Sequence, residues 1–342
     1  MAWKIIEFIA GFVLAAVTLS DVFCSILVPG PSNSRLRVAS RVRQVTLPVW
    51  RWMSRRRSGG QQRLSNSFAP VLFSLAFIGW MVLLLLGFAL ILHASAASFK
   101  PRLHDFGQAI YVSGSYLLTI GTAAAQPQGY TRWILLIEAL SGFGVITATI
   151  TFILEIQSNL HEREASVLRL SGLVGKPPSG LGLLETFAEL DMRSELGGFF
   201  RSWADWSAST LNSHVSFPVL VYFHSVASEI DWVTALQAVL DAATLIVVLA
   251  EEDCGAAVFL HRSGSRMAAH ICELFNLKSE EQHPVTEKQL RSIGERLARC
   301  GYPIRQIDSE TVERFVSLRS DYQGRVAALA QHLGSQQCPL LP

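Results

Sequence analysis

The segment from Val71 to Ala94 constrains the fold more than any other, because it contains no Asp, Glu, Lys or Arg. A helix needs about 20 such residues to cross the hydrocarbon core of a bilayer. Pro70 stands directly before the segment, and proline is well tolerated at the first position of a helix. The sequence therefore predicts a transmembrane helix that begins at Val71.

Two further apolar segments predict helices on either side of this one. Ile5 to Val28 contains two acids, Glu7 near its start and Asp21 toward its end, and is stopped by the Pro-Gly-Pro that follows. Trp133 to Ile153 contains the acid Glu138. We therefore expect three transmembrane helices. A cleaved signal peptide is the alternative for the first segment, but its early region carries only Lys4 and its apolar stretch is long.

Between the last two apolar segments lies the stretch Phe106 to Pro127, FGQAIYVSGSYLLTIGTAAAQP. It is too polar to cross a bilayer twice and too hydrophobic for an ordinary surface loop. Irregular backbone at membrane depth is tolerated only where protein buries it or where it lines a water-filled path. The stretch therefore predicts a re-entrant pore loop, with Thr119-Ile120-Gly121-Thr122 at its narrow end.

A strongly basic segment separates the first two apolar segments. Pro29 to Ser67 holds nine Arg and no Asp, Glu or Lys. Such loops stay in the cytoplasm. The apolar residues between Arg35 and Met53 recur at helical spacing, which predicts a helix lying in the interface, and we expect Arg35 to Arg63 to bind anionic lipid headgroups. A nucleic-acid-binding arm is disfavoured because spanning helices flank the segment on both sides.

A fourth apolar segment, Ala235 to Ala250, lies in the more charged second half of the chain. It is short for a membrane span and contains Asp241. We therefore expect a buried core helix here in preference to a fourth crossing.

These segments predict four regions along the chain: a peripheral transmembrane helix (1–30), the Arg-rich interfacial segment (31–68), a pore domain (69–157) and a helical cytoplasmic domain (158–342). Because the Arg-rich loop is cytoplasmic, the amino terminus is expected outside, the pore loop dips from outside, and the carboxyl-terminal domain lies in the cytoplasm. The fold class is an all-α membrane protein with three transmembrane helices, a re-entrant pore helix and filter, and a helical carboxyl-terminal domain.

The carboxyl-terminal half shows helical periodicity and no persistent strand pattern. The segments Leu183 to Leu190, Trp232 to Leu249 and Thr286 to Leu297 are expected to be helices, and Thr311 to His332 a closing helix. Gly175 to Gly180 is expected to be a linker or tight turn.

No cofactor or metal site is predicted in that half. Gly175-Lys176 lacks the other residues of a phosphate loop, and the adjacent Ser213 and His214 do not make a catalytic triad. The acidic run Glu251 to Asp253 is expected to be a solvated helix end in preference to a divalent-ion site. The five dispersed cysteines are expected to be reduced packing thiols: Cys24, Cys254, Cys272, Cys300 and Cys338.

The residues around the predicted pore loop resemble the pore region of the two-transmembrane potassium channel superfamily, over roughly Val71 to Ile156. That family has a pore helix, a Thr-Val-Gly-Tyr-Gly-Asp filter, a following Pro, and an inner helix with a hinge glycine. Thr119-Ile120-Gly121 matches the start of the filter, Pro127 the following proline and Gly142 the hinge. The resemblance implies a homotetramer around a central path for potassium or another monovalent cation, in a bacterial inner (plasma) membrane.

The chain departs from the family pattern in the outer half of the filter. Thr122 stands where the family has Tyr, Ala123 where it has the second Gly, and Ala124 where it has Asp. An Ala at a position that needs left-handed backbone costs about 1–3 kcal/mol. We therefore expect a filter of different shape, with weaker discrimination between potassium and sodium, or a pore that conducts only after the filter rearranges.

Two residues of the inner helix have open roles. Glu138 is expected to support the pore through a hydrogen bond; the alternatives are an outer-cavity charge that attracts cations, or a structural partner of Ser115 or Thr119. Gly142 is either a gating hinge or a site of tight helix packing.

The sequence thus predicts a tetrameric cation channel, not an enzyme, with filter residues Thr119, Ile120, Gly121, Thr122 and Ala123. The alternative is a nonconducting membrane scaffold or sensor that keeps the channel fold.

Overall fold

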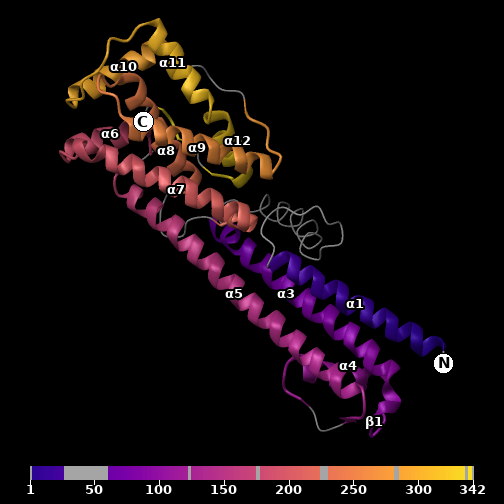
Figure 1. The fold of residues 1–342 in the computed structure, drawn as a ribbon. Helices are drawn as coiled ribbons and strands as arrows, with labels where there is room; N and C mark the ends of the chain where they lie inside the picture. The colour runs from indigo at the N-terminus through magenta and orange to yellow at the C-terminus, as the bar shows by residue number, and fades with distance from the viewer. Residues whose placement is uncertain are drawn as a thin grey trace. The chain divides into compact units, whose positions relative to one another are not determined.

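The computed structural model describes residues 2–26, 61–121, 125–174, 178–223, 230–280, 285–335 and 338–340, with the backbone alone for 61–73. The chain divides into two compact units, Met1–Gln157 and Ser158–Pro342, and both are built of helices (Figure 1). The interfacial helix and lipid-binding segment expected within Arg35 to Arg63 lie outside the described residues, apart from the backbone of 61–63. The turn expected at Gly175 to Gly180 lies outside them in its first half.

Among the described residues, four helices are long and apolar enough to cross a membrane. They are α1 (Ala2–Ile26), α3 (Gln61–Ala94, apolar from Ser74), α5 (Thr131–Ser171) and α8 (Trp232–Leu249). The predominance of helices, together with these four apolar helices, agrees with an all-α membrane protein.

In the first unit, α1 packs lengthwise against α3 (Figure 1). Their contacts pair early residues of one helix with late residues of the other, so the two helices are antiparallel. Glu7 contacts His93 at 2.6 Å, and Asp21 accepts a hydrogen bond from the indole nitrogen of Trp80 at 2.7 Å. Between these pairs the backbones approach so closely that a Cβ on Gly11 would lie 2.5 Å from the carbonyl oxygen of Gly87. Small residues at this crossing are therefore required.

Two helices are longer than the sequence predicts. The expected start at Val71 is wrong, because α3 begins at Gln61 and continues through Pro70. A proline inside a helix removes one backbone hydrogen bond and does not by itself end the helix. Similarly, α5 extends past Ile153 to Ser171. Apolar residues become rarer after Ile153, which ends the membrane-compatible part of α5. The helix itself continues because the Leu, Glu, Arg and Ala that follow are good helix formers.

The second unit consists of the end of α5 and seven further helices among the described residues. They are α6 (Gly180–Glu189), α7 (Leu196–Ser216), α8, α9 (Gly255–Leu274), α10 (Glu287–Arg299), α11 (Ser309–Ser320) and α12 (Gln323–Leu333), with 3-10 turns η2 (Arg193–Glu195) and η3 (Pro218–Tyr222). The single closing helix expected over Thr311 to His332 is wrong, because α11 ends at Ser320 and α12 begins at Gln323.

Helix α8 is the core of this unit. Protein buries 94% of its apolar window, and α6, α9, α11 and α12 pack around it. Its one acid, Asp241, is fully buried and accepts hydrogen bonds from Arg319 at 3.0 Å and the Tyr322 hydroxyl at 2.6 Å. The surroundings of α8 are those of the buried core helix expected from the sequence.

Candidate functional site

The expected pore loop contains a short helix, α4 (Phe106–Leu117), whose start is set by local hydrogen bonds. The Asp105 side chain accepts from the backbone N–H of Gln108 at 2.7 Å, and the Gln108 side chain accepts from the N–H of His104 at 2.8 Å. The first bond satisfies a donor that the first helical turn leaves free, and the second ties the residue before the cap to the same turn.

The two ends of the loop are held together. Strand β1 (Phe99–Lys100) pairs with β2 (Gln126–Pro127) in an antiparallel ladder. The 3-10 turn η1 (Ala96–Ser98) precedes β1, and the carbonyl of Ser98 accepts from the N–H of Gln128 at 2.9 Å. The two ends of the loop therefore lie side by side.

The far end of α4 lies deep between the apolar helices. The Ser113 hydroxyl lies 3.2 Å from the carbonyl oxygen of Leu85 in α3. At a rise of about 1.5 Å per residue, Leu85 is roughly 14 Å along the helix from Ala94. The Leu117 carbonyl lies against Gly142 of α5. The loop thus reaches the middle of the apolar segments before it turns back.

The predicted filter begins directly after α4, where the backbone stops being helical. The N–H groups of Ile120 and Gly121 both bond to the carbonyl of Ser115, at 2.8 and 2.9 Å. Thr119 and Gly121 have positive φ angles of 60° and 73°. This conformation suits glycine and is uncommon for a β-branched residue. Thr122 and Ala123 of the predicted filter, and Ala124, lie outside the described residues.

The side chains at this end of the loop are uncovered within one chain. Ile120 is 76% exposed and Leu118 is 52% exposed, although both follow a helix that is packed against α3. None of the residues that the structure describes lies within 4 Å of the position that a Cβ on Gly121 would take. A single chain therefore leaves the predicted filter open on one side.

Glu138 of α5 is fully buried and contacts the back of α4. One of its carboxyl oxygens accepts a hydrogen bond from the Ser113 hydroxyl, and the other has no partner among the described residues. Ser115, which we considered as a partner, donates to the carbonyl of Tyr111 in its own helix at 2.8 Å. Glu138 thus ties α5 to α4, about one turn before α4 ends at Leu117.

Gly142 is a contact point between the same two helices. Any side chain there would collide with the carbonyl group of Leu117, whereas a Cβ on Gly144 would meet nothing within 4 Å. The contact explains why position 142 requires a glycine in this conformation. A hinge role for Gly142 stays a prediction.

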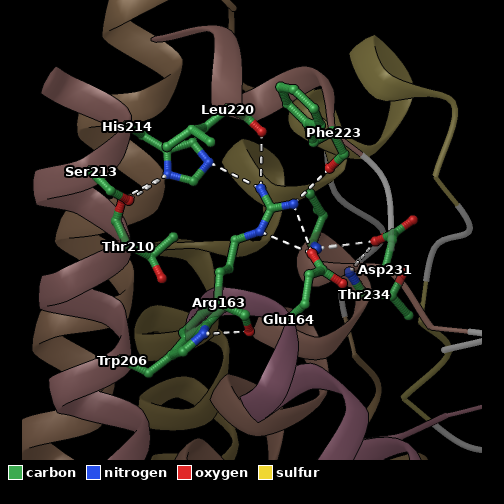
Figure 2. Close-up of polar contacts among 11 residues, drawn as sticks. Arg163, Glu164, Trp206, Thr210, Ser213, His214, Leu220, Phe223, Asp231 and Thr234 are labelled. Atoms are coloured by element: carbon green, nitrogen blue, oxygen red, sulfur yellow. Dashed lines mark hydrogen bonds and ion pairs between the residues drawn. The ribbon is translucent and has the colours of Figure 1, made fainter. Parts of the chain in front are cut away.

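The second unit contains a buried polar cluster that the sequence did not indicate (Figure 2). The guanidinium of Arg163, in α5, donates to Glu164 and to the carbonyls of Leu220 and Phe223, at distances of 2.6 to 3.1 Å. It also contacts the ring nitrogen Nε2 of His214 at 3.3 Å. These contacts attach the end of α5 to α7 and η3.

His214 is neutral in this cluster. Burial, and next the positive charge of Arg163, lower the pKa of His214 from 6.5 to about 3. Because the carbonyl of Thr210 lies 2.7 Å from Nδ1, that nitrogen carries the proton and Nε2 accepts from Arg163. The neighbouring Ser213 donates to the same carbonyl at 3.0 Å (Figure 2). The Ser213 and His214 pair is therefore occupied in structural contacts.

The remaining candidate groups are at the surface or dispersed. Glu251, Glu252 and Asp253 are exposed, and Asp253 pairs with Arg305 at 2.8 Å. All five cysteines are free thiols. In the part of the chain that the structure describes, no group of three or more His, Cys, Asp or Glu is placed to hold a metal ion.

Neither a protein-family model nor a curated protein nor a solved structure matches this chain. The geometry of the loop is thus the evidence on which a function rests.

Proposed function

We propose that the protein is a homotetrameric cation channel of the potassium-channel type, with Thr119 to Ala123 lining the narrow part of the path. In this proposal α5 is the inner helix, α3 the outer helix and α1 a peripheral helix. The amino terminus faces outside and the helical carboxyl-terminal unit lies in the cytoplasm of a bacterial inner membrane.

One observation carries the proposal: a loop closed at its ends by the β1–β2 pair reaches mid-helix depth and there becomes irregular backbone. Within the described residues, the carbonyls of Leu118, Thr119 and Ile120 accept no hydrogen bond. Unpaired carbonyls facing hydrocarbon are costly, so such backbone is expected only against protein or water. Carbonyl oxygens lining a water-filled path are also the groups that replace the hydration shell of a cation.

Several copies are needed because one chain supplies one loop and leaves it uncovered. In this proposal the exposed Ile120 and Leu118 are covered by the same loop of neighbouring copies. A closed ring of loops around an axis covers these side chains equally in every copy. The resemblance to the potassium channel family implies four.

Selectivity is expected to be reduced. The family ring of Tyr that keeps the filter narrow has no counterpart at Thr122, and Ala123 stands at a position that favours glycine. We therefore propose passage of potassium and sodium with weak discrimination between them.

Flux measurements on purified protein in liposomes test the proposal. Potassium and sodium efflux is expected from the unaltered protein, and Gly121→Ala is expected to reduce it at least tenfold. Gly129→Ala is the matched control, because Gly129 also has a positive φ, 58°, and also has nothing within 4 Å of an added Cβ, yet lies outside the predicted filter. This control is expected to retain flux.

The second candidate, a nonconducting scaffold or sensor, is favoured by Ala123 and Ala124 in place of the family residues. It predicts equal leak from protein-free liposomes, the unaltered protein and both variants. That result, obtained with protein that native mass spectrometry shows to be tetrameric, would reject conduction and keep the assembly. A monomer without flux would reject both parts of the channel proposal.

A further inference from the structure

The carboxyl-terminal segment of the chain is held by a side chain that binds its backbone. Helix α12 ends at Leu333 with Gly334 in the left-handed conformation, and the N–H of Ser335 bonds back to the carbonyl of Ala330 at 2.8 Å. This is a complete helix end of the Schellman type. The hydrogen bonds of this helix end do not involve residues 338–340.

Cys338 makes a double hydrogen bond with a residue of the core helix of its own unit. The side-chain amide of Gln237, in the core helix α8, donates to the carbonyl of Cys338 at 2.8 Å and accepts from its N–H at 3.1 Å. This pair reproduces the two bonds that one residue of a β-strand makes with an opposite residue, and recognition of an extended peptide through its main chain works in the same way.

The surrounding surface completes a slot. The Cys338 thiol donates to the carbonyl of Pro178 at 2.6 Å and is 4% exposed, while Leu340 packs against the core. Gln237 is only 5% exposed. An empty slot would leave its buried amide without these two partners, which is unfavourable. The site is therefore built to hold an extended chain.

We propose that the slot around Gln237 and Pro178 is a docking site for an extended peptide, and that its resident ligand is the carboxyl-terminal segment 338–340 of this protein, exchangeable for the same segment of a second copy. The ligand chemistry is an extended backbone with a small hydrogen-bond-donating side chain at the Cys338 position, followed by Pro and Leu. The inference is independent of the proposed channel activity.

Thiol labelling of the intact protein tests exchange without any change to the fold. The competitor is a synthetic peptide of residues 335–342 carrying Cys338→Ser, and a maleimide reagent reports the release of Cys338, with mass spectrometry resolving each cysteine. Cys272 is the internal control because it is equally buried, at 4% exposure. The peptide is expected to raise the labelling rate of Cys338 at least fivefold, saturably, with Cys272 unchanged.

Direct binding gives a second measurement. A variant truncated after Ser335 is expected to bind the fluorescently labelled peptide saturably. Binding is expected to weaken at least tenfold with Gln237→Leu, or when the peptide carries an N-methyl group at position 338, because either change removes the main-chain hydrogen bond. Gln331→Leu, at an exposed position of α12, is the control and is expected to leave binding unchanged.

Three results would overturn the proposal. One is a Cys338 labelling rate that millimolar peptide leaves unchanged, which would make the segment a permanent part of the core, whether or not the truncated variant folds. Another is a parallel rise at Cys272, which would mean general unfolding. The third is equal binding by the Gln237→Leu variant.

Discussion

Helices α1 and α8 are almost equally apolar, yet protein buries only 28% of the α1 window and 94% of the α8 window. In α1 the large exposed residues, such as Trp3, Phe12 and Phe23, lie beside a narrow buried stripe that faces α3. In α8 nearly every residue is enclosed by other helices. Lipid hydrocarbon satisfies an apolar surface as well as a protein core does. The difference teaches that apolarity alone identifies the kind of surroundings a helix needs and leaves open what supplies them.

The largest expected effect tests whether the second unit behaves as a protein-filled core. Arg163→Met removes the guanidinium and leaves Glu164 and two main-chain carbonyls without their donor. Breaking a buried ion pair of this kind costs about 3–5 kcal/mol. The second unit is expected to unfold at a lower urea concentration. Unfolding is monitored by the fluorescence of Trp232, whose ring lies 5.5 Å from the guanidinium.

Arg201→Met is the matched control, because Arg201 is exposed on α7. An equal shift in the two variants would mean that the buried cluster contributes nothing particular to stability.

Truncation of one apolar residue in each helix compares α1 and α8 directly. Leu240→Ala in α8 creates a cavity at a fully buried position and is expected to cost about 2–5 kcal/mol. Ile9→Ala in α1, where Ile9 is 54% exposed, is expected to cost about 0.5 kcal/mol or less. Both are measured as urea unfolding of the detergent-solubilised protein. Similar losses at the two sites would show that α1 is also covered by protein.

The Asp21–Trp80 contact tests the other helix of the comparison, α1, because it is a buried polar contact between α1 and α3. Trp80→Phe keeps the ring packing and removes the indole N–H that Asp21 accepts at 2.7 Å. We expect the free energy of unfolding of the first unit to fall by about 1–3 kcal/mol, measured by thermal unfolding. Trp133→Phe, at a 68% exposed position, is the control and is expected to change little.

The smallest effect is the pH dependence of the second unit. The folded pKa of His214 is about 3 and its ordinary value is 6.5, so below pH 6.5 the unfolded chain binds a proton that the folded chain does not. Stability is therefore full above pH 6.5 and is lost as pH falls toward 3, by at most about 1.4 kcal/mol per pH unit. The urea midpoint at pH 7.5 and 5.5 measures this loss.

The expected pH slope should flatten in the variant His214→Asn and persist in His270→Asn, because His270 is exposed on α9. An unchanged slope in His214→Asn would assign the acid sensitivity to other groups.

The parts of the fold that follow from local composition were predictable. The apolar runs around α1, α3 and α5 and the break between the two halves of the chain all depend on neighbouring residues in the sequence. The limits of the helices were less predictable, since Pro70 lies within α3 and α5 continues into a charged segment. Hydropathy describes the surroundings of a helix, while its length depends on backbone hydrogen bonding.

The partners of buried polar residues were not predictable. Glu138 needed a partner on the grounds of its location, but Ser113 is 25 positions away and only the packing of α4 against α5 brings the two together. Arg163 stands in a charged run that is typical of a solvated helix, and its burial results from η3 and α7 folding over it. Nothing near Gln237 in the sequence indicates that it binds the backbone of Cys338.

The sequence by itself determined that this chain has membrane-compatible helices, a polar loop between two of them, and a second half of different composition. Only the tertiary structure decided that α8 is enclosed by protein, that the loop returns to its starting point through the β1–β2 pair, and that Glu138, Arg163 and Gln237 have the partners they do. The reason is physical: solvent preference is a sum over neighbouring residues, whereas hydrogen-bond partners are chosen among groups that packing brings together from distant parts of the chain.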